Sequence, residues 1–562
     1  MRPACKTGLV VGALTVWLGA VGFVGYNRTN LGDDLAELVN NPVRVLHGEA
    51  PYRDFWLVHP PGEVYLPAAI YRLGFGVNAV LLLNVFISVL VGLAAFWLGR
   101  ILSDSDVEGA LAAVLVFFTG VPGQYRGFSY LHLYLLLLLV AAILLAEYLQ
   151  SHRRATLFFA GAAIGFAFLF RTYVTGAAAV AMSVALAVEA RRRNCPWGTA
   201  VGLLAICGSG CLAALAGTLP WLAGSLPEMW HATLVDSVAH AVTRQSSYGH
   251  SVVDSWRILA DCLGHLREEP SRPAHYFWTA VEASEFLKRG SMHVLPLLLI
   301  PIWLCHRRLR PAASGRTEWM LLFFLLWGGL TFIRPITRGA DPAQLSQATT
   351  PLYLALVVVV RPLIVHWRET RSIAAGLAAG SILAATVGIG QAAISITLKQ
   401  LEIQRRSAET IRAPYGTVVF NSRRRADELR GLLAVVLENT VEQDHIFVIP
   451  WHAPAIYALT RRYNPTYYDS TIDLFYRPDE EKQRQVCAAL QEKNTRLIIA
   501  RADMPGPGWD EVQWPCALPL VNAFIEDQFE RIGDVGRFSV WRPRPDSVRT
   551  GSAEENTDAP GP

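Results

Sequence analysis

The chain has 562 residues, of which 52% are apolar and 17% are charged, and its net charge is +4. Soluble domains carry about 25% charged residues, so this composition excludes a wholly soluble protein. The net charge as a total excludes little, and nothing in the composition predicts a nucleic-acid partner.

Long apolar runs fill the first 397 residues, and a helix that crosses a bilayer needs about 20 such residues. We therefore expect a mainly α-helical, multi-pass membrane protein with eleven spans, within one or two because three runs are short. The predicted spans cover residues 8–26, 76–100, 107–120, 128–149, 155–171, 173–190, 197–222, 290–305, 318–333, 346–366 and 371–396. The first run lacks the small-residue cleavage site of a signal peptide, which predicts a retained span.

Arginines gather in alternate short loops, and this asymmetry predicts the orientation of the chain. The loops on the same side as the N-terminus contain Arg153, Arg154, Arg191, Arg192, Arg193, Arg307, Arg308, Arg310, Arg316, Arg361, Arg368 and Arg371. The positive-inside rule then places the N-terminus in the cytoplasm. It places residues 27–75, 223–289 and everything after about 397 outside.

The first outer loop, residues 27–75, opens with two adjacent carboxylates, Asp33 and Asp34. They stand where an amphipathic helix is predicted to begin, and Asp is a preferred N-cap residue. Adjacent carboxylates beside a membrane also suit acid–base catalysis or metal binding. The residues alone leave both interpretations open, and the two are compatible because a cap fixes the position of a carboxylate. Residues 63–73 predict a short helix on the membrane surface.

Beyond the transmembrane domain, residues 1–397, the composition changes to alternating strands and helices. The predicted strands are 416–420, 445–450, 496–500 and 537–543, and the predicted helices are 423–440, 453–460 and 479–493. This alternation predicts a soluble α/β domain over residues 412–545, with a small parallel sheet and helices on its faces. A disordered tail, 546–562, follows. The domain contains no G-x-G-x-x-G and no phosphate loop, so it is not expected to be a nucleotide enzyme.

The eight cysteines and the histidines of the second outer loop, 223–289, do not have the spacing of a metal site. Cys487 and Cys516 share the predicted outer domain and could form a disulfide.

Three groups of residues in the first loop carry a resemblance to a known family. They are the pair Asp33–Asp34, the segment 48–55 (Gly-x-x-Pro-Tyr-x-Asp-Phe) and the segment 59–62 (His-Pro-Pro-Gly). Their order after a first span resembles the GT-C superfamily of polytopic membrane glycosyltransferases. The closest branch looks like the protein O-mannosyltransferases and the aminoarabinose lipid A transferases. Weaker matches at 337–345 and 446–469 extend the resemblance over the whole chain.

The resemblance implies a GT-C-like fold and an inverting hexosyl or pentosyl transfer from a polyprenyl-phosphate-sugar donor. The implied acceptor is an extracytoplasmic glycan, lipid or protein, and the implied place is a bacterial inner (plasma) membrane. The implied roles are catalysis by Asp33 as base with Asp34 beside it, donor-phosphate binding by Arg53, His59 and Arg338, and support by Asp54 and Asp341. No organic cofactor is expected, and a divalent metal is a candidate.

The chain departs from the family at three positions. Its acidic pair is Asp-Asp where many relatives have Asp-Glu, and Gln344 stands where they have a His. His59 takes the place of a Lys that contacts the lipid phosphate in the aminoarabinose branch. A histidine is charged only part of the time near neutral pH. If His59 takes the phosphate-contacting place, its replacement by lysine is expected to be tolerated or mildly activating.

A different class of function remains as the alternative: a non-enzymatic transporter, flippase or scaffold for lipid-linked glycans. Transporters usually carry ionisable residues or broken helices near the bilayer midplane. Here nearly all charges lie in loops, which favours surface chemistry by an enzyme.

Overall fold

The structure is a computed structural model, and its contacts divide the chain into two compact units. The first unit comprises Met1–Tyr26, Val58–Glu63 and Leu81–Arg405, and the second comprises Asn27–Leu57, Val64–Val80 and Arg406–Pro562. The structure describes residues 3–25, 38–57, 59–119, 132–218, 225–231, 290–309, 315–338, 342–373, 409–420, 422–449, 453–468, 480–501 and 518–545, with scattered residues at 233, 257 and between 375 and 401. The predicted tail and Cys516 lie outside the described residues.

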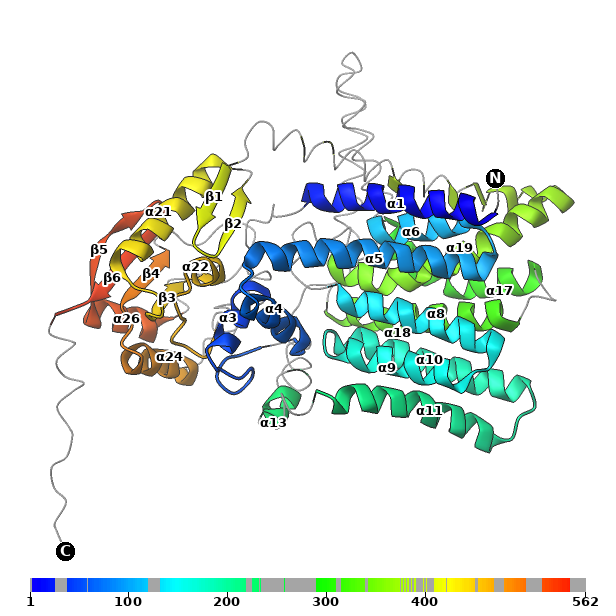
Figure 1. Ribbon diagram of the computed structural model, residues 1–562, viewed down its shortest axis with the longest axis horizontal. Helices are drawn as coiled ribbons and strands as arrows, with labels where there is room; N and C mark the ends of the chain where they lie inside the picture. The colour runs from blue at the N-terminus through cyan, green and yellow to red at the C-terminus, as the bar shows by residue number, and fades with distance from the viewer. Residues whose placement is uncertain are drawn as a thin grey trace, which may run out of the picture. The chain divides into compact units, whose positions relative to one another are not determined.

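Long apolar helices make up the first unit (Figure 1). Seven of the described helices have the length and composition to cross a membrane, which is the pattern of a helical integral membrane protein. They are α1 (Pro3–Gly25), α5 (Val77–Ser103), α8 (Leu133–Ser151), α10 (Thr172–Arg192), α11 (Trp197–Ala216), α18 (Gly315–Arg338) and α19 (Pro342–Thr370). The shorter helices are α6 (Asp106–Thr119), α9 (Arg154–Phe168), α13 (Leu226–Trp230), the 3-10 helix η2 (Leu295–Leu298) and α17 (Leu299–Leu309).

The predicted spans correspond to these helices to different degrees. Seven of the eleven fall on the long helices, and three fall on the shorter helices α6, α9 and α17. The last, 371–396, lies on residues that the structure describes only in part. The count of eleven spans therefore stays a prediction.

Glycines allow α9 and α11 to pack closely against each other. A Cβ added to Gly161 of α9 would lie 1.9 Å from the carbonyl oxygen of Cys207. One added to Gly210 of α11 would lie 2.0 Å from the carbonyl oxygen of Phe158. No real Cβ atom tolerates such a distance, so only glycine fits at these crossings. Close backbone approach through small residues is typical of helix pairs in membranes.

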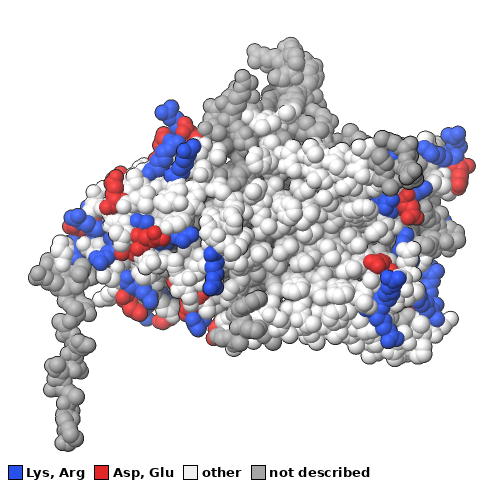
Figure 2. All heavy atoms as spheres, viewed as in Figure 1, with Lys and Arg blue, Asp and Glu red and all other residues white. Residues whose placement is uncertain are grey.

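The charged side chains of the helical unit lie at the ends of its helices. In Figure 2 most of the visible face of the helical unit is white, and blue and red atoms gather at one end. At one helix end Arg100 Nε pairs with Asp106 Oδ1 at 2.7 Å, and Thr7 Oγ1 donates to Asp106 Oδ2 at 2.9 Å. An uncharged lateral face is what a lipid environment requires.

The second unit contains a sheet of four strands and a separate hairpin (Figure 1). Its elements are α3 (Asn41–Leu46), most of α4 (Gly62–Arg72), β1 (Glu409–Ala413), β2 (Gly416–Phe420), α21 (Arg423–Asn439), β3 (Ile446–Ile449), α22 (Ala453–Thr460), α24 (Glu480–Glu492), β4 (Leu497–Arg501), α26 (Pro519–Gln528), β5 (Phe529–Val535) and β6 (Phe538–Pro543). The sheet has the order β3-β4-β6-β5, and β1 pairs with β2 alone.

The prediction of a parallel sheet is wrong for two of its three strand pairings. Only β3 and β4 are parallel, whereas β6 is antiparallel to both β4 and β5. The cause is local: β5 and β6 are joined by the two residues Gly536 and Arg537, and a connection that short forces an antiparallel pair. Gly536 has a φ of 59°, which glycine adopts without strain.

The core of this sheet explains why the predicted strands read as apolar runs. Phe447 of β3 and Ile498 of β4 are fully buried and pack with Val486 and Leu490 of α24 and with Ile525 of α26. The two helices therefore cover one face of the sheet.

Candidate functional site

The structure describes only some of the predicted site residues. Asp33, Asp34 and Asp341 lie outside the described part of the chain. Arg338 is the last residue of α18, and only its backbone is described. The predicted catalytic pair is therefore neither placed nor contradicted.

Arg53 and Asp54 form a local pair in the second unit. Arg53 Nη2 lies 2.7 Å from Asp54 Oδ2, and the same oxygen accepts a hydrogen bond from the Ala50 amide at 2.7 Å. The hydrogen bond from Arg53 lowers the pKa of Asp54. Asp54 therefore stabilises the turn from residue 50 to residue 54. The Arg53 side chain is 56% exposed.

Arg44 is a buried anchor that the sequence did not single out. Its side chain is 5% exposed and pairs with Glu49. Its Nη1 and Nη2 donate to the carbonyl oxygens of Thr466 at 3.0 Å and Asp54 at 3.2 Å. The guanidinium also lies 4.8 Å from the ring centre of Phe55. One cation thus holds the first loop together and joins it to a segment more than 400 residues away.

Further contacts join the first loop to the segment 463–468 within the second unit. The Tyr467 hydroxyl donates to the carbonyl oxygen of Tyr52 at 2.8 Å, and the Trp56 amide donates to the carbonyl oxygen of Tyr467 at 2.7 Å. The loop that carries the predicted site therefore depends on the C-terminal part of the chain for its conformation. The sequence predicts this loop as part of the transmembrane domain, residues 1–397, whereas the contacts of the structure group it with the C-terminal part.

His59 lies in the first unit, in contact with the start of α10. Arg171 Nη1 lies 2.9 Å from His59 Nδ1, and Arg171 Nε lies 3.6 Å from Glu63 Oε1. The side chains of Arg171 and Glu63 are 5% and 2% exposed. The segment is fixed nearby, because the Gly62 amide donates to the Leu169 carbonyl oxygen at 2.8 Å. A Cβ on Gly62 would lie 2.5 Å from that oxygen, which explains the glycine after the two prolines.

Arg334 is a second cation near His59. Its guanidinium lies 3.9 Å from the ring centre of Tyr173 at the start of α10. Within the described ranges, no hydrogen bond or ion pair to this guanidinium is found, and its Nε is buried without a hydrogen-bond partner. Arg338 follows four residues later as the last residue of α18.

The charge of this group of residues resides on the arginines. Burial lowers the pKa of His59 well below its ordinary value, and the positive charges of Arg171 and Arg334 lower it further. A neutral His59 accepts a hydrogen bond from Arg171 and orients that guanidinium. We name His59, Glu63, Arg171 and Arg334 the arginine cluster.

Buried polar side chains lie in the apolar unit around the cluster. His132 Nδ1 lies 3.0 Å from Ser88 Oγ, and the His132 amide donates to Asn84 Oδ1 at 3.1 Å. All three residues are buried. The Tyr134 hydroxyl is buried and has no hydrogen-bond partner in the part of the chain that the structure describes. Polar groups buried among apolar helices are costly and are typical of functional sites.

Among the described residues, no group of three or more His, Cys, Asp or Glu side chains could hold a metal ion. A divalent metal bound by Asp33 and Asp34 stays a prediction, because both carboxylates lie outside those residues.

The sequence identifies His59 as a candidate site residue but gives no signal for Arg171. Arg171 ends one predicted span and precedes the next, a position where an arginine usually contacts lipid headgroups. Only the fold brings it beside the Pro-Pro-Gly segment.

No model of a known protein family matches the chain, and no curated protein matches it at a significant level. The functional interpretation therefore depends on the residues themselves.

Proposed function

We propose that the protein is a GT-C-like membrane glycosyltransferase that uses a polyprenyl-phosphate-sugar donor. It transfers the sugar with inversion to an extracytoplasmic glycan, lipid or protein. The observation that carries the proposal is the arginine cluster, in which Arg171 lies beside Glu63 and Arg334 is a second cation near His59 with no ion pair within the described ranges.

The charge of the cluster suits the phosphate of a lipid-linked donor. A cation that is partly removed from water is unfavourable unless an anion compensates it. Arg334 has no such anion within the described ranges, and a phosphate of the donor would supply one. The same arginines would stabilise the charge that grows on the lipid phosphate as the glycosidic bond breaks.

The remaining roles follow from the sequence. Asp33 removes the proton of the acceptor hydroxyl, and Asp34 supports it by hydrogen bonding or through a metal. As the resemblance implies, Arg53 and Arg338 are further candidates for binding the donor phosphate. The C-terminal domain, with no nucleotide-binding motif, serves as a support or in acceptor recognition, without catalysis of its own.

The proposed topology has eleven spans and a cytoplasmic N-terminus in a bacterial plasma membrane. The first loop and the C-terminal domain then share the outer side, where a lipid-linked donor and an envelope acceptor can meet. The arginine asymmetry of the loops supports this arrangement.

The proposal is tested by release of polyprenyl phosphate from a panel of labelled polyprenyl-phosphate sugars by the purified full chain. With the donor so identified, Arg334→Gln is expected to raise its KM about 10- to 100-fold, the size of a lost hydrogen bond to a charged group. Arg191→Gln at the end of α10 removes the same charge far from the cluster and should leave KM unchanged.

Two outcomes would contradict the proposal. One is that the wild-type chain releases no lipid phosphate from any donor while it binds or translocates the intact molecule, which would establish the transporter alternative. The other is an equal KM for wild type and Arg334→Gln.

A further inference from the structure

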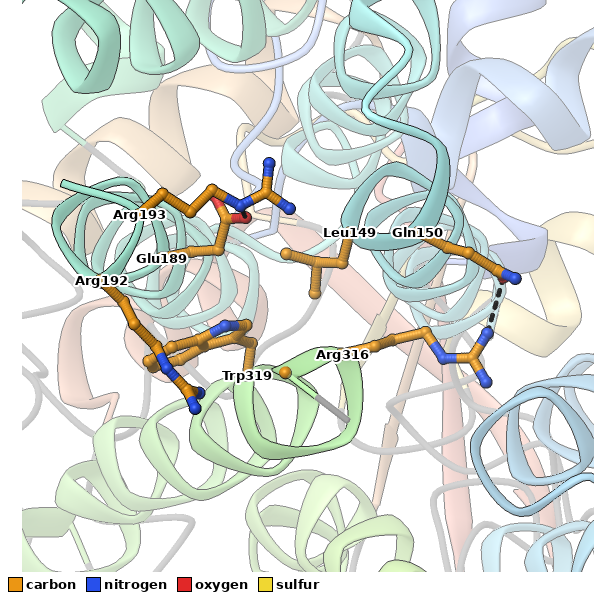
Figure 3. Close-up of a pocket in the computed structure, with 8 residues that line it drawn as sticks. Leu149, Gln150, Glu189, Arg192, Arg193, Arg316 and Trp319 are labelled. Carbon is orange, nitrogen blue, oxygen red and sulfur yellow. Dashed lines mark hydrogen bonds and ion pairs between the residues drawn. The ribbon is translucent and has the colours of Figure 1, made fainter. Parts of the chain in front are cut away.

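A second basic site lies at the other end of the same helices. A pocket of about 570 Å³ opens where α8 and α10 end and where α18 begins (Figure 3). It is lined by Leu149, Gln150, Glu189, Arg192, Arg193, Gly315, Arg316 and Trp319. Arg171 stands at the start of α10 and Arg192 at its end, so about 30 Å of helix separate the pocket from the arginine cluster.

Three arginines reach this pocket from two helices. Arg192 and Arg193 come from the end of α10, and Arg316 comes from the first turn of α18 (Figure 3). Arg193 Nε pairs with the buried Glu189 at 2.5 Å. Arg316 Nη1 donates to Gln150 Oε1 at 2.7 Å, as the dashed line in Figure 3 shows.

Arg192 is the arginine with the most spare hydrogen-bonding capacity. Its Nη1 lies 2.6 Å from Glu318 Oε2, and its guanidinium lies 5.5 Å from the ring centre of Trp319. An arginine carries five N–H donors, and Glu318 occupies one of its terminal nitrogens. The remaining donors can meet a further anion, and a planar guanidinium suits the oxygens of a phosphate.

The charge balance of the pocket favours an anion. Three arginines and one carboxylate, that of Glu189, line the pocket. Even when Glu318, the partner of Arg192, is counted as well, positive charges outnumber negative ones. Positive residues near an anionic membrane surface attract its headgroups.

The apolar part of the lining favours a lipid over a small soluble anion. Leu149 and the buried Trp319 lie beside the arginines at the ends of helices that are apolar enough to cross a membrane. Tryptophan is enriched at the membrane–water interface, where headgroup and acyl chain meet. Basic pockets between transmembrane helices bind anionic headgroups by this combination.

We propose that this pocket binds the phosphate of an anionic phospholipid headgroup, with Arg192, Arg193 and Arg316 as its cations. In the proposed topology the pocket faces the cytoplasmic leaflet, so it is separate from the donor site. The proposal requires that the helices cross a membrane, and it does not depend on the glycosyltransferase activity.

The test measures binding of three probes to the purified full chain in a neutral detergent. The probes are dioctanoyl phosphatidylglycerol, dioctanoyl phosphatidylcholine and sodium phosphate. Phosphatidylglycerol is expected to bind at least fivefold more tightly than phosphatidylcholine. Inorganic phosphate is expected to compete only weakly.

Two variants of the ion pair give opposite expectations. Arg192→Gln should weaken phosphatidylglycerol binding about fivefold, and Glu318→Gln should strengthen it by a similar factor, since each changes one charge near the phosphate. The matched control is Arg191→Gln, which removes an exposed charge from the same helix turn outside the pocket and should change binding less than twofold.

The opposite changes in phosphatidylglycerol affinity distinguish a role in lipid binding from a role in folding. If the ion pair were purely structural, both substitutions would change the affinity in the same direction. The proposal is overturned if phosphatidylglycerol and phosphatidylcholine bind equally, or if inorganic phosphate binds as tightly as the lipid. It is also overturned if Arg191→Gln weakens binding as much as Arg192→Gln does.

Discussion

Arg44 and Arg53 stand nine residues apart in one loop, yet their surroundings differ. Arg44 is buried, pairs with Glu49 and donates to two carbonyl oxygens. Arg53 pairs with its neighbour Asp54 on an exposed surface. Burial decides which of the two matters for stability, because exposed ion pairs contribute little.

The loss of Arg44 is therefore expected to destabilise the protein far more than the loss of Arg53. Arg44→Met leaves buried carbonyl groups and Glu49 without their donor, which should cost about 2–4 kcal/mol. Arg53→Met should cost about 0–1 kcal/mol and serves as the control. Thermal unfolding of the purified chain measures both changes. Equal losses would show that the contacts of Arg44 do not hold the loop.

His59 shows how the fold changes an expectation from sequence. The resemblance alone predicts that a lysine at this position is tolerated. Next to Arg171 and Arg334, it would add a third cation against Glu63, so we now expect His59→Lys to lower stability. The reason is that like charges close together in a partly buried site repel each other strongly.

The lowered pKa of His59 predicts a dependence of stability on pH. Because the folded pKa lies below the ordinary value near 6.5, the unfolded chain binds more protons. The stability contributed by neutral His59 is complete above about pH 6.5 and is lost as the pH falls toward the folded pKa. His59→Gln keeps a hydrogen-bond acceptor and removes this titration.

Melting temperatures between pH 8 and 5 test this expectation. Wild type should lose more stability than His59→Gln as the pH falls, while His47 and His445, whose pKa values are also lowered, titrate alike in both proteins. Parallel curves for the two proteins would refute the assignment.

Among the described glycines, Gly161 and Gly210 at the crossing of α9 and α11 leave the least room for a side chain. Gly210→Val would drive a side chain into the Phe158 carbonyl oxygen and should destabilise the protein by about 1–3 kcal/mol or more. Gly202 lies on the same helix with nothing within 4 Å of an added Cβ, so Gly202→Val is the matched control. Comparable stability of the two variants in a detergent melt would mean that the crossing is wrong.

The sequence predicted elements well where their patterns are strong. The apolar runs 416–420, 446–449 and 497–500 are strands, and the short helix predicted at 63–73 corresponds to α4. The strand β5 was missed because it is a mostly exposed edge strand, "FERIGDV", without the alternation of a half-buried strand. The apolar runs also do not predict whether two strands pair parallel or antiparallel, because that depends on which strands become neighbours in the fold.

The candidate site was only partly predictable for the same reason. The Pro-Pro-Gly segment pointed to His59, but Arg171 and Arg334 lie 112 and 275 residues further along the chain and meet it only through packing. The sequence around a basic residue at a helix end does not indicate which residue it will contact.

For the whole molecule, the orientation of the chain is testable. Two single-cysteine chains, with all other cysteines replaced by alanine, serve as probes. One keeps the native Cys195 and the other carries Arg424→Cys. The two should differ in labelling by a membrane-impermeant thiol reagent. We expect position 424 to react on intact spheroplasts and Cys195 only after lysis, because the arginines around Cys195 predict a cytoplasmic loop. The reverse pattern would place the first loop on the cytoplasmic side.

The central claim is that carboxylates of the first loop catalyse sugar transfer. Its most direct test is the rate of polyprenyl-phosphate release by wild type, Asp33→Asn and Asp34→Asn under saturating donor. We predict a fall of about 10²–10⁴-fold for Asp33→Asn, the usual contribution of a general base. The melting temperature should be unchanged, because Asn also caps helices well. If both variants turn over at the wild-type rate, the carboxylates are only helix caps and the claim is contradicted.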